Sequence, residues 1–336
     1  MSIYPEFSKE LLKCLKTNNN FLIVGHTHPD GDCIYSGLAL AELLKSLNKN
    51  NKVTLASSGP FNKTEIMEQK KKFTNILTAE YLETKPLICI VDCSELSRVD
   101  SVLPQETFEN LNYIILDHHG SSSCKGPLFY ISPESISTTL IIQKLSENLN
   151  LVENKDFAQS VLRGFITDSG CFRFLRASQN ETFPMLERII SPYHLSISTE
   201  YEYLFFGKNL QSIKFLTTLI DRSKTYFDGQ LLISENTKED DENFEGISLP
   251  ADEFYSQTLP LEKIRVIVLL KYKGNNLTNL GFRSTHSSNI DVSKVACNLP
   301  NRANEGGGHM HASGVNLNLN LEEAKKTVIS YFSKLL

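Results

Sequence analysis

The sequence predicts an α/β protein of two domains: an N-terminal, mainly parallel sheet with helices on both faces, and a smaller C-terminal α+β domain. Two observations support this prediction. Short apolar runs alternate with segments of helical spacing through the first half of the chain, as in strand–helix–strand units. A second series of strand-like segments begins near residue 225. The length of 336 residues is sufficient for two cores.

In the first half, continuous apolar runs are typical of strands buried on both faces, and we expect such strands at 21–24, 87–91 and 113–116, with a further strand at 52–56. Segments with helical spacing follow or precede them. They lie at 7–15, 33–47, 63–77, 138–149 and 156–166. Asp32 stands where a helix N-cap or first-turn carboxylate is favoured. Residues 169–176 are predicted as a turn and a short strand.

In the second half, residues 198–222 predict one or two helices, and 239–241 an acidic loop. Strands are expected at 226–234, 264–272 and 277–283, with a hairpin turn joining the last two. A short helix at 291–299, alternation at 315–320 and a terminal helix at 322–336 complete the chain. We place the domains at 1–195 and 223–336, with a helical linker at 196–222.

Bulk composition excludes several classes of function. The net charge of −5 gives no general attraction to a long nucleic acid. No run reaches the roughly 18 apolar residues of a membrane span, and the first residues lack the pattern of a signal peptide. The seven cysteines are odd in number and form no CxxC pair, so we expect neither a disulfide framework nor a structural zinc site. These features favour a cytoplasmic protein.

Four apolar runs each lead into an Asp or His. Their polar residues are His26, Asp30 and Asp32; Asp92; Asp117, His118 and His119; and Asp168. Ligands of open α/β sheets bind at the carboxyl ends of strands, so these residues predict one converging metal site. Each has a plainer explanation: turn chemistry around Pro29, helix caps at Asp92 or Asp168, or an ion-paired His pair. Their joint occurrence favours metal, because six of the eight histidines lie in three such loops: 26, 28, 118, 119, 309 and 311.

The donors are imidazole and carboxylate without thiolate. They suit Mn²⁺, with Fe²⁺, Mg²⁺ or Co²⁺ as substitutes, better than structural zinc. Two divalent ions would offset the charge of four Asp. Two metals about 3.5–4 Å apart can activate water and clamp both oxygens of an in-line displacement, so a phosphate ester is the natural substrate. Cys33, Cys93 and Cys171 lie near these residues, and we expect them only to pack.

The order His-x-x-x-Asp-x-Asp, strand-end Asp, Asp-His-His and Thr-Asp-Ser-Gly resembles the motifs of the DHH phosphoesterase superfamily. The segment from Glu305 to Gly314 resembles the Gly-Gly-Gly-His element of its DHH-associated substrate domain. The length is similar to that of the short oligoribonucleases, pAp phosphatases and stand-alone cyclic-di-AMP or pApA phosphodiesterases. The sequence departs from the pattern in three places: the extended segment before the glycines, Glu305 in place of a glycine, and an extra His311.

The resemblance implies roles for individual residues. One metal would be held by His26, Asp30 and Asp92, and the other by Asp32, Asp92, His118 and Asp168, with Asp92 bridging. Asp92, His118 and His119 would serve catalysis, and Asp117 would orient the His pair. The residues implied for substrate binding, in a cleft between the domains, are His119, Arg283, Gly306, Gly307, Gly308 and His309. His28 matches no ligand, and we expect it to be exposed or to pack.

The resemblance implies a Mn²⁺-dependent phosphodiesterase that hydrolyses short phosphodiesters (cyclic-di-AMP, pApA or nano-RNA) to mononucleotides. A phosphomonoesterase acting on 3′-phosphoadenosine 5′-phosphate and a catalytically silent nucleotide sensor are the alternatives. The expected partners are a short nucleotide and two divalent cations, without long nucleic acid or membrane, and a homodimer is implied by resemblance alone. The chain contains no P-loop and no G-x-S-x-G elbow, so a P-loop hydrolase and a serine hydrolase are unsupported.

Overall fold

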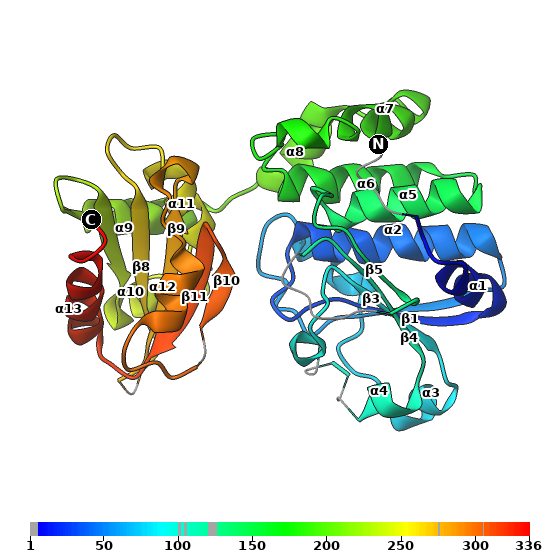
Figure 1. Cartoon of the computed structure of the whole chain (residues 1–336), viewed down its shortest axis with the longest axis horizontal. Helices are drawn as coiled ribbons and strands as arrows, with labels where there is room; N and C mark the ends of the chain where they lie inside the picture. The colour runs from blue at the N-terminus through cyan, green and yellow to red at the C-terminus, as the bar shows by residue number, and fades with distance from the viewer. Residues whose placement is uncertain (1–5, 100–101, 104–105, 120–125, 275, 305) are drawn as a thin grey trace. The chain divides into compact units, whose positions relative to one another are not determined.

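A computed structural model describes residues 6–99, 102–103, 106–119, 126–274, 276–304 and 306–336. The chain divides into two compact units, Met1–Gly207 and Lys208–Leu336. Each unit contains its own sheet (Figure 1). Each also has its own buried clusters of apolar side chains. The segment expected as a linker contains α8 (Ile197–Phe205) in the first unit and α9 (Leu210–Asp221) in the second.

The sheet of the first unit is fully parallel, as expected. Its strands lie in the order β2 (Lys52–Ala56), β1 (Asn20–Val24), β3 (Leu87–Val91), β4 (Tyr113–Asp117) and β5 (Phe129–Ile131). All of β3, and all but the first residue of β1 and of β4, are buried. Both faces of these strands are therefore covered, which explains their unbroken apolar runs. The short β5 was not expected.

Helices cover both faces of this sheet, also as expected (Figure 1). The larger core lies under α1 (Lys9–Thr17), α2 (Gly31–Leu47), α5 (Thr138–Leu149) and α6 (Lys155–Asp168). A smaller cluster on the other face includes side chains of α3 (Ala79–Glu83) and α4 (Thr107–Asn110). The α7 helix (Thr182–Tyr193) and α8 pack on α6.

The contact between α2 and α6 fixes the edge at which the predicted ligands lie. Asp30 caps α2 by accepting a hydrogen bond from the Cys33 N–H at 3.1 Å. Gly164, within α6, lies directly against the first turns of α2 and α5. A Cβ at this position would be 2.9 Å from Asp32 Oδ1 and 2.8 Å from Thr139 Oγ1. Any side chain there would therefore push these groups apart.

The second unit has a mixed sheet in the order β10 (Gly307–His309), β11 (Ala312–Leu317), β9 (Thr278–Ser284), β8 (Val266–Tyr272), β7 (Leu231–Asn236) and β6 (Lys224–Tyr226). The β7–β8 pair is parallel and the others are antiparallel, including the predicted β8–β9 hairpin. One face packs on α12 (Val292–Asn298) and α13 (Leu321–Phe332), and the other on α9 and α11 (Ala251–Thr258). This α+β arrangement agrees with the sequence prediction.

Two expectations in the first unit were wrong. The helix expected at 63–77 is only a 3₁₀ segment, η1 (Met67–Lys72). The chain becomes extended after it because Thr74 bridges to Ala56 and donates its N–H to the Leu55 carbonyl at 2.9 Å. The short strand expected within 169–176 is a compact turn. Its residues Gly170, Cys171 and Phe172 all have positive φ, which a strand excludes.

Two expectations in the second unit were also wrong. The single strand expected at 226–234 is divided into β6 and β7, because Phe227, Asp228 and Gly229 adopt positive φ. The acidic loop at 239–241 lies within α10 (Lys238–Asn243), where Thr237 and Asp240 form a capping box. Acidic residues stabilise the start of a helix.

Two broader sequence expectations concern cysteine and the membrane. The six cysteines in the described part of the chain are free thiols. Among the residues that the structure describes, no helix is both long and apolar enough to cross a bilayer.

We expect Gly164→Ala to lower the free energy of unfolding by about 1–3 kcal/mol, the usual cost of overpacking. The gain in helix propensity, about 1 kcal/mol, offsets this loss only in part. Gly37→Ala in α2 is the matched control, because a Cβ there would lie no closer than 3.4 Å to a neighbour. Urea denaturation followed by circular dichroism measures both variants. Equal stability of the two would show that the contact at Gly164 is not tight.

Candidate metal centre

Three adjacent strand ends deliver imidazole and carboxylate groups to one edge of the first sheet. The strands β1, β3 and β4 are neighbours and parallel, so their carboxyl ends lie together. His26 follows β1, Asp92 follows β3, and His118 and His119 follow β4. This edge is where open α/β sheets bind their ligands.

Helix ends supply the remaining carboxylates. Asp30 is the N-cap of α2, and Asp32, in the first turn of the same helix, is fully buried. Asp168 is the last residue of α6, which packs along α2. The first unit therefore contains all of the residues predicted as metal ligands.

Asp92 lies at the middle of the cluster and is 1% exposed. Its Oδ2 is 3.5 Å from His26 Nε2, whereas its Oδ1 is 3.5 Å from His118 Nε2 and 3.7 Å from His119 Nδ1. The two oxygens thus face imidazoles that come from different strands. Asp92 has a left-handed φ of 57°, a conformation that Asp tolerates better than most residues.

A second group of donors surrounds His118. Its Nε2 is 3.4 Å from Asp168 Oδ2 and 4.0 Å from Asp32 Oδ2. Ligand atoms of Asp32, His118 and Asp168 all lie within 4.8 Å of one another, as do those of Asp92, His118 and His119. A third group, not predicted from the sequence, contains His26, Asp92 and Cys33.

The start of α5 holds two of these carboxylates in place. Asp32 accepts the N–H groups of Thr138 and Thr139, at 2.6 and 3.1 Å. The Thr138 hydroxyl donates to Asp92 Oδ1 at 2.9 Å. Helix N-termini favour negative charge. Sequence reasoning missed both threonines, although Ser137-Thr-Thr at the start of a predicted helix was a usable signal.

Each imidazole is oriented by an acceptor on its Nδ1. His26 Nδ1 donates to the Thr27 carbonyl at 2.9 Å, and His118 Nδ1 faces the Ser135 carbonyl at 3.3 Å. Both rings therefore present Nε2 to the cluster, where a metal ligand needs its lone pair. His119 Nδ1 donates to Asp117 Oδ1 at 2.7 Å. Asp117 also accepts the N–H groups of His118 and His119, so it orients the pair as expected.

In the absence of a cation, burial and mutual repulsion disfavour the ionised form of these carboxylates. Burial, followed by the charges of Asp32 and Asp30, raises the pKa of Asp92 well above its usual range. Burial and the same two neighbours also raise the pKa of Asp168 well above its usual range. Burial also raises the pKa of Asp32, although His118 and the Thr138 N–H oppose it. These groups would ionise readily beside a positive charge.

The His26 side of the cluster behaves differently. Burial opposes ionisation of Asp30, but His26, Lys63 and the Cys33 N–H outweigh it and lower the pKa of Asp30. Burial likewise disfavours the charged form of His26, yet Cys33 and Asp30 raise its pKa to about 9. An imidazolium thus offsets part of the negative charge. The buried oxygen and nitrogen donors fit divalent cations, which would neutralise the rest.

The residues predicted to bind substrate lie in the second unit, apart from His119. Arg283 is on β9 and is half-buried, with its guanidinium carbon 4.5 Å from the centre of the Tyr255 ring. Gly307, Gly308 and His309 form β10, and Gly306 precedes it. His309 pairs with Ala312, which pairs with Arg283, so all three lie in one row of the sheet. Glu305 lies outside the described residues.

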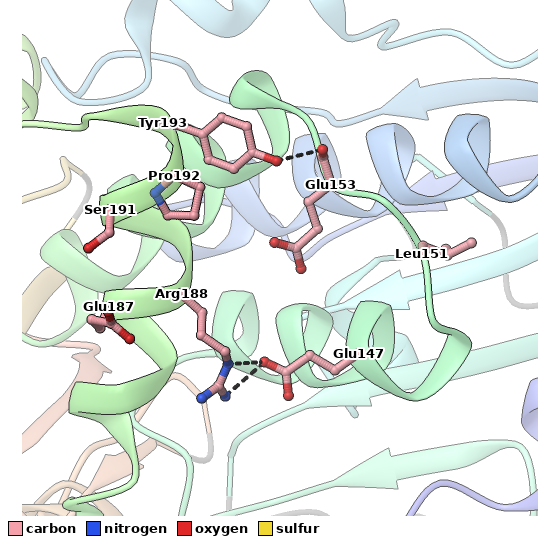
Figure 2. Close-up of a pocket in the computed structure, with 8 residues that line it drawn as sticks. All are labelled: Glu147, Leu151, Glu153, Glu187, Arg188, Ser191, Pro192 and Tyr193. Atoms are coloured by element: carbon pink, nitrogen blue, oxygen red, sulfur yellow. Dashed lines mark hydrogen bonds and ion pairs between the residues drawn. The ribbon is translucent and has the colours of Figure 1, made fainter.

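His28 is exposed, which is one of the two positions expected for it. A hollow of about 480 Å³ also lies in the first unit, lined by residues of α5, α7 and the segment between α5 and α6 (Figure 2). Its polar groups contact one another: Arg188 pairs with Glu147 at 2.8 Å, and Tyr193 donates to the Glu153 carbonyl at 2.5 Å. It contains none of the predicted site residues.

Comparison with known proteins matches residues 20–165 to the DHH family, N-terminal domain. The chain is 26% identical to a bifunctional oligoribonuclease and PAP phosphatase of Thermus thermophilus, over 95% of this chain and 90% of that protein. It is 24% identical to a cyclic-di-AMP phosphodiesterase of Listeria monocytogenes but spans only 49% of its length. An exopolyphosphatase-related protein of Bacteroides fragilis has a similar fold, with a TM-score of 0.82, 21% identity and coverage of 97% and 96%.

We expect Thr138→Val to weaken Mn²⁺ binding about ten- to a hundredfold, the usual effect of removing a group that orients a metal ligand. Valine keeps the shape of threonine but removes the hydroxyl that donates to Asp92. Thr138→Ser is the matched control, because it keeps the hydroxyl. Isothermal titration calorimetry measures the affinity. Wild-type affinity in Thr138→Val would contradict the assigned role.

In protein stripped of metal, we also expect the free energy of unfolding of Asp92→Asn to increase relative to that of wild type as the pH rises. The pKa of Asp92 is raised in the folded state, so its favourable contribution is lost as the pH rises through that value. Asparagine cannot ionise and tolerates the left-handed backbone. Urea denaturation in EDTA at about pH 5 and about pH 8 measures the difference. If the difference in free energy of unfolding between the two proteins is the same at both pH values, the raised pKa of Asp92 is contradicted.

Proposed function

We propose that this chain, of which residues 20–165 match the DHH family, N-terminal domain, is a Mn²⁺-dependent phosphodiesterase that hydrolyses short phosphodiesters to mononucleotides. The proposed substrates are cyclic-di-AMP, the linear dinucleotide pApA and RNA of a few nucleotides. One observation supports this most directly: His26, Asp32, His118 and Asp168 converge with the buried Asp92 in one cluster. Mn²⁺ suits this mixture of imidazole and carboxylate.

We assign one cation to His26, Asp30 and Asp92, and a second to Asp32, Asp92, His118 and Asp168. The orientation of Asp92 supports a bridging role, because its two oxygens face His26 and His118 separately. Thr138 keeps Oδ1 in this orientation through its hydroxyl. The assignment of Asp30 rests on the resemblance and on its charge interaction with His26.

When bound, such cations lower the pKa of water and stabilise the negative charge that develops around phosphorus. The chain's own residues prepare for this chemistry. Carbonyls of Thr27 and Ser135 hold the His26 and His118 rings with Nε2 toward the cluster. Asp117 holds His119 beside Asp92, where we propose that His119 contacts a substrate phosphate oxygen. Burial of Asp32 and Asp92 excludes bulk water from their carboxylates.

We propose that Arg283, His309 and the glycines at 306–308 bind a phosphate of the substrate. Arg283 is 31% exposed, and its ion-pair partner Asp252 is 3.6 Å away and 64% exposed. An exposed pair of this kind is weak, so a phosphate can compete for the guanidinium. A Cβ on Gly307 would meet nothing within 4 Å, which leaves its backbone open to a ligand.

A second candidate activity is removal of a phosphate from pAp. The observation that favours it is the likeness to the Thermus relative, a bifunctional oligoribonuclease and PAP phosphatase of which this chain spans 90%. Both activities would use the same metal centre, since each displaces an oxygen from phosphorus.

One experiment tests these proposals. Purified protein with Mn²⁺ is incubated with cyclic-di-AMP, pApA, pAp and di- or triribonucleotides, and products are separated by ion-pair chromatography. We expect mononucleotide from at least one diester and none from Asp92→Asn. Nucleotide binding without any product would favour a silent sensor. Equal turnover by Asp92→Asn would refute the metal-centre mechanism.

For the preferred substrate, we expect Arg283→Ala to raise KM about tenfold or more with a smaller change in kcat. A hydrogen bond to a charged group contributes about 1.5–3 kcal/mol, which corresponds to that change in affinity. Lys273→Ala is the matched control, because it removes an exposed positive charge from the same unit. Steady-state kinetics separates the two constants. An unchanged KM in Arg283→Ala would argue against phosphate binding at this residue.

A further inference from the structure

Among the described residues, Cys33 is the one cysteine in the groups of three possible metal donors that include Asp92. Its sulfur lies within 4.8 Å of the ligand atoms of His26 and Asp92, and those two atoms are equally close to each other. The side chain is 3% exposed. Three donor types, imidazole, thiol and carboxylate, therefore surround one small volume on the His26 side of the cluster.

The fold aims the thiol at this volume. Cys33 is in the first turn of α2, where its N–H is fixed by Asp30 Oδ1 at 3.1 Å. Gly25, directly after β1, leaves room for the sulfur, because a Cβ on Gly25 would collide with Cys33 Sγ. Asp32, one residue earlier on the helix, bonds instead to the Thr138 and Thr139 N–H groups. The first turn of α2 thus separates a carboxylate on one side from a thiol on the other.

We propose that His26, Cys33 and Asp92 form a site for a thiophilic divalent cation, Zn²⁺, at which the Cys33 thiolate is a ligand. The proposal rests on the metal centre proposed above and adds a donor to it. Thiolate and imidazole are preferred zinc ligands, whereas Mn²⁺ prefers oxygen donors. The His26 side would therefore bind Zn²⁺ more tightly than Mn²⁺ and lose Mn²⁺ when Zn²⁺ is present. Zn²⁺ would then inhibit the Mn²⁺-loaded enzyme.

The binding step balances without any redox partner. Each donor binds zinc in its deprotonated form. On binding, the S–H bond of Cys33 and the Nε2–H bond of a protonated His26 break, sulfur–zinc and nitrogen–zinc bonds form, and the protons pass to the solvent. Zinc keeps its charge, so no electron is transferred.

Cobalt spectroscopy tests the proposal on the full-length chain. Co²⁺ replaces Zn²⁺ in such sites, and a thiolate ligand gives it a charge-transfer absorption in the near ultraviolet. We expect that absorption in wild type and its loss in Cys33→Ser. We also expect Cys33→Ser to weaken Zn²⁺ binding about tenfold or more by calorimetry, with Mn²⁺ affinity changed about twofold at most. Cys93→Ser is the matched control, because Cys93 is as buried but lies outside the three-donor group.

The outcomes separate this inference from the proposed function. Wild-type protein that binds Co²⁺ without the thiolate absorption would overturn it and leave Cys33 as a packing residue. Suppose that wild type binds Mn²⁺ and turns over substrate, and that Cys33→Ser binds Zn²⁺ as tightly as wild type does. That result would also overturn the inference, while the proposed function would stand. Failure of wild type to bind Mn²⁺, Co²⁺ or Zn²⁺ would overturn both. The wild-type spectrum decides the matter even if Cys33→Ser does not fold.

Discussion

Mutual repulsion among buried carboxylates is the constraint on which the first unit depends. Asp32, Asp92 and Asp168 are forced close together by three strand ends and the tight α2–α6 contact, and burial of Asp32 and Asp92 removes the water that would screen their charges. The protein opposes this repulsion with fixed dipoles: the N–H groups of Thr138 and Thr139 face Asp32, and the Thr138 hydroxyl faces Asp92. Imidazoles complete the balance. The same features that make the cluster unfavourable by itself would favour a bound divalent cation.

The parts that sequence predicted well are those encoded locally. Strands buried on both faces leave unbroken apolar runs, so the ends of β1, β3 and β4 could be located, and with them His26, Asp92 and His118. Thr138 and Cys33 could not be assigned in this way. The role of Thr138 depends on α5 meeting Asp32, which is 106 residues away in the chain. The role of Cys33 depends on the missing side chain of Gly25, and a hydrophobic-looking cysteine in a helix carries no such information.

The wrong predictions have a common physical origin. The charged segment before Phe73 has the composition of a helix, but pairing of Thr74 along β2 outweighs that propensity. The segment after Asp168 has apolar residues at strand-like spacing, but three successive residues adopt left-handed angles. In both places a tertiary or backbone requirement overrides a local preference. The turn after Asp168 also ends α6, because the Cys171 N–H donates a hydrogen bond to the Ile166 carbonyl at 2.8 Å.

The left-handed backbone of Asp92 has a consequence for the history of such proteins. A residue in this conformation is restricted to a few types whatever chemistry it performs, because a bulky or branched side chain there is strained. A descendant that abandoned hydrolysis would be released from the need for a carboxylate but not from the need for this angle. Drift at the position would then be channelled toward asparagine or glycine. The left-handed backbone at this position would therefore be retained after the activity was lost.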